Sequence, residues 1–470
     1  MKLIYGIKDR PKFGQVIVFA IQQLLAIMAA TLVVPVIINT SGSMPPFAPQ
    51  MSSAAALFGA GIGTLVYLLF TRFKSPVFLG SSFAFIGSMC SAFAGAISAQ
   101  AGYLGLIIGA VCAGLVYVVI ALIVKFAGVK WISKLMPAVV IGPTVAIIGL
   151  SLAGNAIGDL QTAPAGGSSY VAILCGLVTL AVTMLCATFG KKMIRLIPFI
   201  MGILAGYALA AIFTLIGNAA GIDALKVINF APLTNLFTDF SIKSIVSVPD
   251  FTFVEALKGI KDIDAAYIGT VAVAYAPVAF VVFAEHIADH KNLSSIIEKD
   301  LLEDPGLHNT LLGDGVGSMA GAFFGGCPNT TYGESVGCVA ITGNASVITI
   351  LTTAVMAIVI SFLSPFVAFV NTIPSCVMGG VCMALYGFIA VSGLKMIQKV
   401  DLEQNRNLFV VSVILITGIG GLSVSFGKVT LTTIACALIL GILANVMLGV
   451  KDKKAAEEQA PESEDNTYEL

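Results

Sequence analysis

The chain has 470 residues, of which 58% are hydrophobic and 11% are charged, and its basic and acidic side chains cancel to a net charge of zero. Soluble domains carry about a quarter charged residues, so this composition predicts an integral membrane protein without a large soluble domain. The zero net charge argues against a nucleic-acid partner, and the nine cysteines form no C-x-x-C pair, which argues against a thiolate zinc site.

Apolar runs recur along the whole chain, and a run of roughly 20 residues is enough to cross a bilayer as a helix. The first run is longer than the apolar region of a cleavable signal, so we expect it to remain as the first span. About fourteen runs can span or half span, at 16–38, 51–71, 77–97, 102–126, 132–153, 169–189, 196–218, 267–288, 309–325, 333–342, 347–370, 375–397, 407–424 and 429–449. Gly59 and Gly63 on the second run predict a closely packed partner helix.

Basic residues gather in loops that share one side of the membrane if the fourteen runs alternate in direction. The opposite loops "NTSGSMPPFAPQ", "SAQAG" and "GDLQTAPAGGSS" contain no Lys or Arg. The positive-inside rule therefore predicts that both termini are cytoplasmic. The basic residues are Lys2, Lys8, Arg10, Lys12, Arg72, Lys74, Lys125, Lys130, Lys134, Lys191, Lys192, Arg195, Lys395, Lys399 and Arg406.

The longest break in apolar character divides seven runs from seven. An odd number of spans in each half implies that the halves have opposite orientations, a common transporter plan. We therefore predict an all-α polytopic membrane protein of about fourteen transmembrane segments in two inverted seven-segment repeats. Its parts are a cytoplasmic N-terminus (1–15), a first repeat (16–218), an extracytoplasmic linker (219–266), a second repeat (267–449) and a cytoplasmic tail (450–470).

The two halves share an interruption at corresponding positions, "FLGSSFAFIG" in the third run and "PNTTYGESVG" in the tenth. Both patterns predict an extended segment that enters a short helix. Non-helical backbone at membrane depth is tolerated only where protein or a cavity satisfies its polar groups, so the pair predicts a binding site. The alternative is two irregular turns at the membrane surface.

Four carboxylates fall inside or at the ends of the predicted spans: Glu285, Asp289, Asp314 and Glu334. A carboxylate is costly in the membrane and is a functional candidate by default. Glu334 follows Gly333 at the start of a short helix, where free amides and the positive end of the helix dipole collect. Alternatively, these glutamates pair with helix ends or hydroxyls and only stabilise packing.

A planar ligand with alternating N–H and C=O groups suits such a site, and uracil is one. Glu285 and Glu334 would accept its N–H bonds, the backbone amides of Phe83 and Gly333 would donate to its carbonyls, and the rings of Phe83 and Tyr332 would form an apolar wall. Burial favours the neutral form of a carboxyl group, so we expect transport to be coupled to protons.

Two enzymatic motifs are missing from the sequence. It contains no G-x-x-x-x-G-K-[ST] phosphate loop and no H-E-x-x-H, so we expect neither ATP-driven transport nor zinc-dependent hydrolysis, and no cofactor. We expect His286 and His290 to face the cytoplasmic interface rather than to bind a metal.

Six landmarks in order make the chain resemble the nucleobase/ascorbate transporter family, and most closely its bacterial uracil permease branch. They are "YGIKDRP", "VFLGSSFAFIG", "AEHIADHKNL", "EKDLLEDPGLH", "PNTTYGESVGCVAITG" and "VMGGVCMALYG". The resemblance implies a core domain of segments 1–4 and 8–11, a gate domain of segments 5–7 and 12–14, and short strands in segments 3 and 10. It also implies proton coupling and is compatible with a homodimer.

Carried over position by position, the resemblance assigns substrate binding to seven residues: Glu285, Glu334, Phe83, Gly333, Tyr332, Ala30 and Tyr386. Three positions depart from the family pattern, because Asp289 and Gln23 each stand where a His is usual and Ser335 stands where an Asn is usual. With Glu285 and Glu334, Asp289 and Asp314 are candidates for proton coupling.

The resemblance leaves the substrate open between two nucleobases. Asp314 matches the purine-transporting branch and favours xanthine or uric acid, whereas Glu334 favours uracil, which we prefer. Two further alternatives are an anion transporter of the same architecture, which paired glutamates disfavour, and a membrane receptor or scaffold that does not transport.

Overall fold

The computed structural model describes residues 3–45, 48–128, 137–191, 193–238, 241–426 and 429–458. Lys2, Lys130, Lys134, Lys192 and the end of the predicted tail (459–470) lie outside the described residues. The helices are α1 (Phe13–Thr40), α2 (Ser53–Phe70), α3 (Ile86–Ala94), α4 (Ala99–Ala127), α6 (Ala138–Ser151), α7 (Ala153–Leu160), α8 (Ser169–Phe189), α9 (Met193–Leu196), α10 (Pro198–Ala220), α11 (Ala231–Thr238), α12 (Thr252–Lys258), α13 (Ala265–Ile297), α14 (Leu307–Gly325), α15 (Gly333–Thr342), α16 (Val347–Ser361), α17 (Ser364–Thr372), α18 (Ser375–Ile397), α19 (Asn405–Ile419) and α20 (Thr433–Glu458).

Short elements connect these helices. The strands are β1 (Leu79–Ser81), β2 (Asn329–Thr331), β3 (Val424–Phe426) and β4 (Val429–Leu431), and the single-turn helices are η1 (Phe83–Phe85), η2 (Asp223–Leu225), η3 (Ile242–Ser244), η4 (Ile260–Asp262) and η5 (Leu302–Gly306). β1 pairs with β2 and β3 with β4, both antiparallel.

Among the described residues, eight helical stretches are long and apolar enough to cross a membrane, which confirms a multi-pass membrane protein. They are α1, α2, α4, α6 with α7, α8, α10, α13 and α18. Each of the fourteen predicted apolar runs contains at least one helix, although several are interrupted. The run predicted at 347–370 is divided into α16 and α17, and Pro365 lies in the first turn of α17, where its missing N–H costs nothing.

Two helices extend well beyond the ends of their predicted runs. α13 continues past residue 288 to Ile297, and α20 continues to Glu458, into the region predicted as a tail. The apolar run marks only the part of a helix that lies in hydrocarbon, so hydropathy alone underestimates a helix that continues beyond it.

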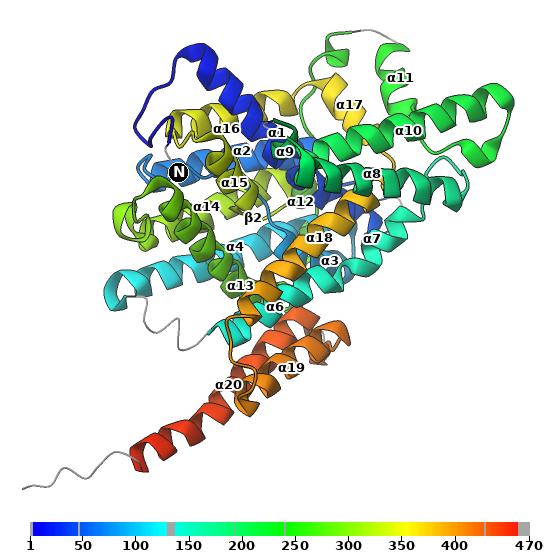
Figure 1. Ribbon diagram of the computed structural model, residues 1–470. Helices are drawn as coiled ribbons and strands as arrows, with labels where there is room; N and C mark the ends of the chain where they lie inside the picture. Colours follow the sequence, from blue (N-terminus) through cyan, green and yellow to red (C-terminus); the bar gives the residue numbers. More distant parts are fainter. Residues whose placement is uncertain are drawn as a thin grey trace, which may run out of the picture.

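The helices form two groups by their most extensive pairings. One group pairs α14 with α2 and α4, α13 with α4, and α16 with α1 and α2. The other pairs α18 with α6, α7 and α8, α10 with α8, and α19 with α6 and α20. Figure 1 shows α19 and α20 together at one end of the molecule, beside α6.

The α2–α14 pair is held together by glycines from both helices. A Cβ on Gly59 would lie 2.4 Å from the carbonyl oxygen of Gly321, and a Cβ on Gly63 would lie 2.7 Å from that of Gly317. Only glycine allows the two backbones to approach this closely, so the packing role predicted for Gly59 and Gly63 is confirmed.

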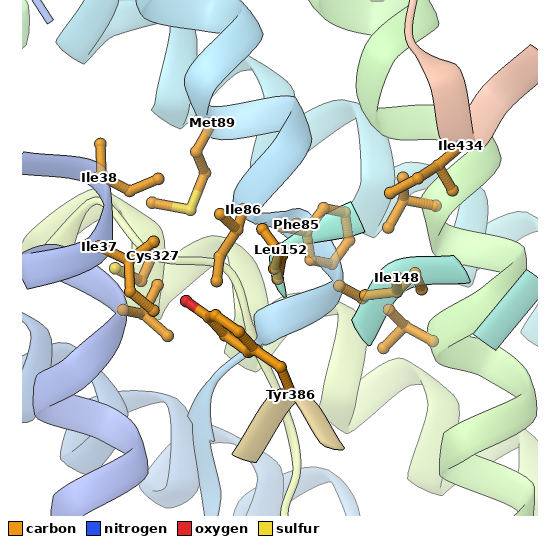
Figure 2. Close-up of a cluster of buried hydrophobic side chains, with 14 of the residues drawn as sticks. Ile37, Ile38, Phe85, Ile86, Met89, Ile148, Leu152, Cys327, Tyr386 and Ile434 are labelled. Carbon is orange, nitrogen blue, oxygen red and sulfur yellow. The ribbon is translucent and has the colours of Figure 1, made fainter. Parts of the chain in front are cut away.

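A buried apolar cluster lies where the two groups meet. Figure 2 shows Ile37 and Ile38 of α1 and the side chains of Phe85, Ile86 and Met89 gathered with Ile148, Leu152, Tyr386 and Ile434. All of these side chains are less than 9% exposed. The cluster excludes water from this part of the boundary between the groups.

The N-terminal segment pairs with the connection between α15 and α16. Ile4 N donates to Gly343 O at 2.7 Å, and Ala345 N donates to Tyr5 O at 2.9 Å. These bonds attach the "YGIKDRP" segment to the end of the short helix that carries Glu334.

Candidate functional site

Two short strands meet from distant parts of the chain. In the β1–β2 pair Gly80 lies opposite Thr330, and Ser82 N extends the pairing by donating to Pro328 O at 2.9 Å. The extended segments predicted in "FLGSSF" and "PNTTYG" are therefore confirmed.

Each strand leads directly into the N-terminus of a helix. β1 is followed by η1, which begins at Phe83, and β2 is followed by α15, which begins at Gly333. The first amides of a helix have no partner within it and lie at the positive end of its dipole. Two sets of hydrogen-bond donors from the two halves of the chain thus come together beside the strands.

A cavity of about 450 Å³ lies at these helix ends, which is within the usual size range of small-molecule sites. Both helix groups contribute to its walls. Its lining residues are Ser82, Phe83, Ala84, Val145, Phe199, Ala284, Glu285, Ala288, Asp289, Thr330, Thr331, Tyr332, Gly333, Glu334, Leu385, Phe388, Ile389, Ser392 and Met396.

Three carboxylates reach this cavity. Glu285 and Asp289 are one turn apart on α13, and Glu334 is the second residue of α15. The side chain of Thr331 donates to Asp289 Oδ2 at 3.0 Å. None of the three forms an ion pair with a Lys or Arg among the described residues.

Two buried hydroxyls that the sequence analysis did not single out also line the cavity. The Oγ of Ser82 and the Oγ1 of Thr330 have no hydrogen-bond partner in the described part of the chain. A hydroxyl can both donate and accept, so each can adapt to a polar ligand. Ser82 and Thr330 belong to the two motifs that predicted the site. Their residue types did not mark them as ligand-binding, because serine and threonine are common in helices and strands.

The ring of Tyr332 has a structural role at the strand crossing. It is 3% exposed and lies so close to Gly80 that a Cβ there would be 2.4 Å from the ring. Its hydroxyl donates to Ser81 O at 2.8 Å. Tyr332 contacts the cavity, and its ring also fixes the geometry of β1.

Ala30 and Tyr386 are not among the residues that line the cavity. Ala30 is buried on α1, in an apolar cluster that includes Tyr332. The ring of Tyr386 contacts Phe83 edge-on at 6.4 Å, and Figure 2 shows its hydroxyl directed into the apolar cluster near Ile37 and Ile86.

Asp314 and the two α13 histidines form a separate buried network. His286 Nδ1 lies 2.7 Å from Asp314 Oδ2, and His290 Nε2 lies 2.6 Å from the hydroxyl of Tyr67. The two imidazole rings stack at 4.0 Å. The expectation that His286 and His290 face the cytoplasmic interface is wrong, because both are fully buried. Their spacing of four residues places them on one face of α13. Their partners, Asp314 of α14 and Tyr67 of α2, could not be identified from the sequence.

In the part of the chain that the structure describes, no group of three or more His, Cys, Asp or Glu residues is arranged to hold a metal ion. The arrangement is instead suited to a planar polar ligand, with acceptors on Glu285 and Glu334 and donors at two helix N-termini.

Comparison with known proteins identifies the family. A model described as a permease family matches residues 14–426. The chain belongs to the nucleobase/ascorbate transporter family. It is 37% identical to the uracil permease of Bacillus subtilis (strain 168), covering 98% of each chain, and 37% identical to that of Bacillus caldolyticus, covering 95% of each. It is 34% identical to the uracil permease of Escherichia coli (strain K12), covering 98% of this chain and 97% of that one. This family member is therefore a transporter and not an enzyme.

Solved structures share the fold of this transporter at low sequence identity. The transmembrane domain of a cyanobacterium bicarbonate transporter, BicA, matches with a TM-score of 0.57 at 15% identity, covering 93% of this chain and 99% of that one. The murine anion transporter Slc26a9, in the inward-facing state, matches with a TM-score of 0.60 at 13% identity, covering 95% of this chain and 70% of that one. These similarities concern the fold alone.

Gln23 and Ser335, at two of the positions where the resemblance predicted a departure from the family pattern, are in contact. The side-chain amide of Gln23, on α1, donates to the Oγ of Ser335, on α15. That oxygen also accepts from Phe78 N at 3.0 Å. Gln23 and Ser335 therefore form one hydrogen-bonded unit that joins α1, α15 and the start of β1.

Proposed function

We propose that this transporter is a proton-coupled symporter that imports uracil by alternating access. The observation that carries the proposal is a single cavity in which Glu285 and Glu334 lie beside the helix N-termini at Phe83 and Gly333. Relatives named uracil permease cover nearly the full length of the chain and support the same substrate.

The chemistry of uracil complements these groups. Its two N–H groups would donate to the carboxylates of Glu285 and Glu334, and its carbonyls would accept from the backbone amides of Phe83 and Gly333. The free hydroxyls of Ser82 and Thr330 give further hydrogen bonds. Phe83 supplies an apolar face, as small-molecule sites generally require.

Alternating access would follow from movement of one helix group against the other. We identify the group that contains α1, α2, α4, α13, α14 and α16 with a core domain and the group that contains α6, α8, α10, α18, α19 and α20 with a gate domain. The separate pairing within each group supports this division. The cavity takes Val145, Phe199 and Leu385 from the second group, so relative movement would change access to it.

The fourteen segments would form two inverted repeats, 16–218 and 267–449, joined by the extracytoplasmic linker 219–266. The asymmetry of Lys and Arg between loops supports cytoplasmic termini in a bacterial inner membrane. In that orientation the part of the cavity lined by Ser392 and Met396, near the end of α18, would lie toward the cytoplasm.

Proton coupling would use buried carboxyl groups. Glu285, Glu334 and Asp289 line the cavity, and Asp314 lies in the histidine network. Carboxyl groups in low-dielectric surroundings bind protons readily, which ties occupancy to the proton gradient.

Equilibrium binding of labelled uracil to purified Glu285→Gln and Glu334→Gln variants tests the assignment. Loss of one charge-assisted hydrogen bond costs about 1.5–3 kcal/mol, so we expect each Kd to rise about ten- to hundredfold. The matched control is Glu303→Gln, an exposed residue outside the cavity, and its affinity should be unchanged. Affinity within twofold of the unmodified protein in both cavity variants would refute the proposed site.

Two other substrates remain to be compared with uracil. Xanthine has the same pyrimidinedione face, and the fold is shared with bicarbonate and anion transporters. Competition with excess unlabelled xanthine or bicarbonate distinguishes them. Displacement of uracil by xanthine at lower concentration than by uracil itself would assign a purine substrate, and displacement by bicarbonate would assign an anion.

A further inference from the structure

A second, much smaller cavity of about 10 Å³ lies between α4, α14 and β2. Its polar lining consists of Tyr117, Asp314, Ser318 and Asn329. Tyr117, Asp314 and Asn329 are 4%, 1% and 2% exposed, so bulk water does not reach them. None of these residues lines the substrate cavity.

Three polar atoms at this small cavity have no hydrogen-bond partner among the described residues: the hydroxyl of Tyr117, Oδ1 of Asp314 and Oδ1 of Asn329. The other polar atoms of the Asp314 and Asn329 side chains are already hydrogen-bonded. Asp314 Oδ2 lies 2.7 Å from His286, and Asn329 Nδ2 donates to Gly59 O at 3.1 Å. These bonds fix both side chains, so the free oxygens cannot turn toward other partners.

Buried polar atoms are nearly always hydrogen-bonded, and three exceptions around one cavity require a common explanation. The set contains one donor, the tyrosine hydroxyl, and two acceptors, the carboxylate and amide oxygens. A water molecule has the complementary set, since it accepts one bond from Tyr117 and donates one each to Asp314 and Asn329. A buried water typically makes about three hydrogen bonds and needs about 10–15 Å³, and the volume of this cavity lies at the lower end of that range.

We propose that this small cavity is a binding site for one structural water molecule, held by Tyr117, Asp314 and Asn329. The water joins α4 and α14 to β2, the strand whose next residues line the substrate cavity. It thereby connects the Asp314–His286 pair to the strand crossing. The site does not depend on which substrate is transported.

Thermal unfolding of Tyr117→Phe tests the sign of this interaction. If the hydroxyl bonds to a water, its removal lowers Tm by about 1–2 °C, because a chain of this length shifts little per interaction lost. If the hydroxyl has no partner, its removal raises Tm, because an unsatisfied buried group is lost. The matched control is Tyr275→Phe, since Tyr275 is also buried with no partner in the described part of the chain but does not line this cavity. The Tm of this control should rise.

A density map of the purified protein at a resolution that shows other buried waters gives the direct test. We expect one peak within hydrogen-bond distance of all three oxygens. An empty cavity in that map, or a Tm of Tyr117→Phe above that of the unmodified protein, would overturn the proposal. The Tm is also compared in buffers that contain choline or sodium as the cation. A higher Tm in sodium that is seen in the unmodified protein and absent in Asp314→Asn would assign a cation to the cavity instead of water.

Discussion

Ser335 accepts two buried hydrogen bonds, and the loss of its hydroxyl should therefore be more damaging than the loss of either donor. In Ser335→Ala, Phe78 N and the amide of Gln23 lose their common acceptor. Each unsatisfied buried donor costs about 1–3 kcal/mol, so we expect the free energy of unfolding to fall by about 2–6 kcal/mol. In Gln23→Leu, Ser335 keeps its bond from Phe78 N, and the loss should be about 0.5–1.5 kcal/mol.

The double variant Gln23→Leu/Ser335→Ala completes the cycle. It no longer contains the Gln23 amide that the single serine variant leaves unpaired, so its loss should be smaller than the sum of the single losses by about 1–3 kcal/mol. The assay is equilibrium unfolding of the purified protein in mixed micelles, with uracil binding measured on the same samples. If the losses add to within about 0.5 kcal/mol, the two side chains do not act as a unit and the reasoning is refuted.

Three further predictions concern packing, proton-binding geometry and the substrate wall. Gly63→Ala should lower the free energy of chemical unfolding by about 1–3 kcal/mol, because the added methyl group would lie 2.4 Å from the side-chain amide of Asn329 on β2. Gly337→Ala is the control: its methyl group would have nothing within 4 Å, so the free energy of unfolding should rise by about 0.5–1 kcal/mol. Thr331→Val should reduce uracil uptake about two- to tenfold, because Asp289 loses the donor that fixes its carboxylate, and unchanged initial rates would contradict this. Tyr386→Phe should keep uptake within about twofold, because its hydroxyl lies in the apolar cluster, and a larger loss would indicate direct substrate contact.

The strand crossing could be predicted from sequence because its signals are local. Gly80 and the polar run that begins at Asn329 interrupt apolar segments at corresponding positions, and non-helical backbone at membrane depth must be satisfied by protein. The same reasoning predicted that Glu334 lies at the N-terminus of a helix, since the extended segment must end where the next apolar run begins.

Contacts between distant residues could not be predicted in this way. Gln23 and Ser335 are separated by 312 positions, and nothing in either local pattern identifies the other. His286 and His290 stand at the end of an apolar run and are followed by charged residues. In the sequence alone, this pattern is typical of residues at the membrane surface. Their burial depends on Asp314 and Tyr67, which other helices bring to α13.

Initial uptake of labelled uracil into sealed vesicles that contain the purified protein tests the central claim most directly. Rates are compared with an acid-outside proton gradient and after an ionophore collapses it. The account predicts accumulation that depends on the gradient and is lost in Glu285→Gln and Glu334→Gln. Uptake that is equally fast without the gradient, or no uptake by folded protein in sealed vesicles, would contradict it.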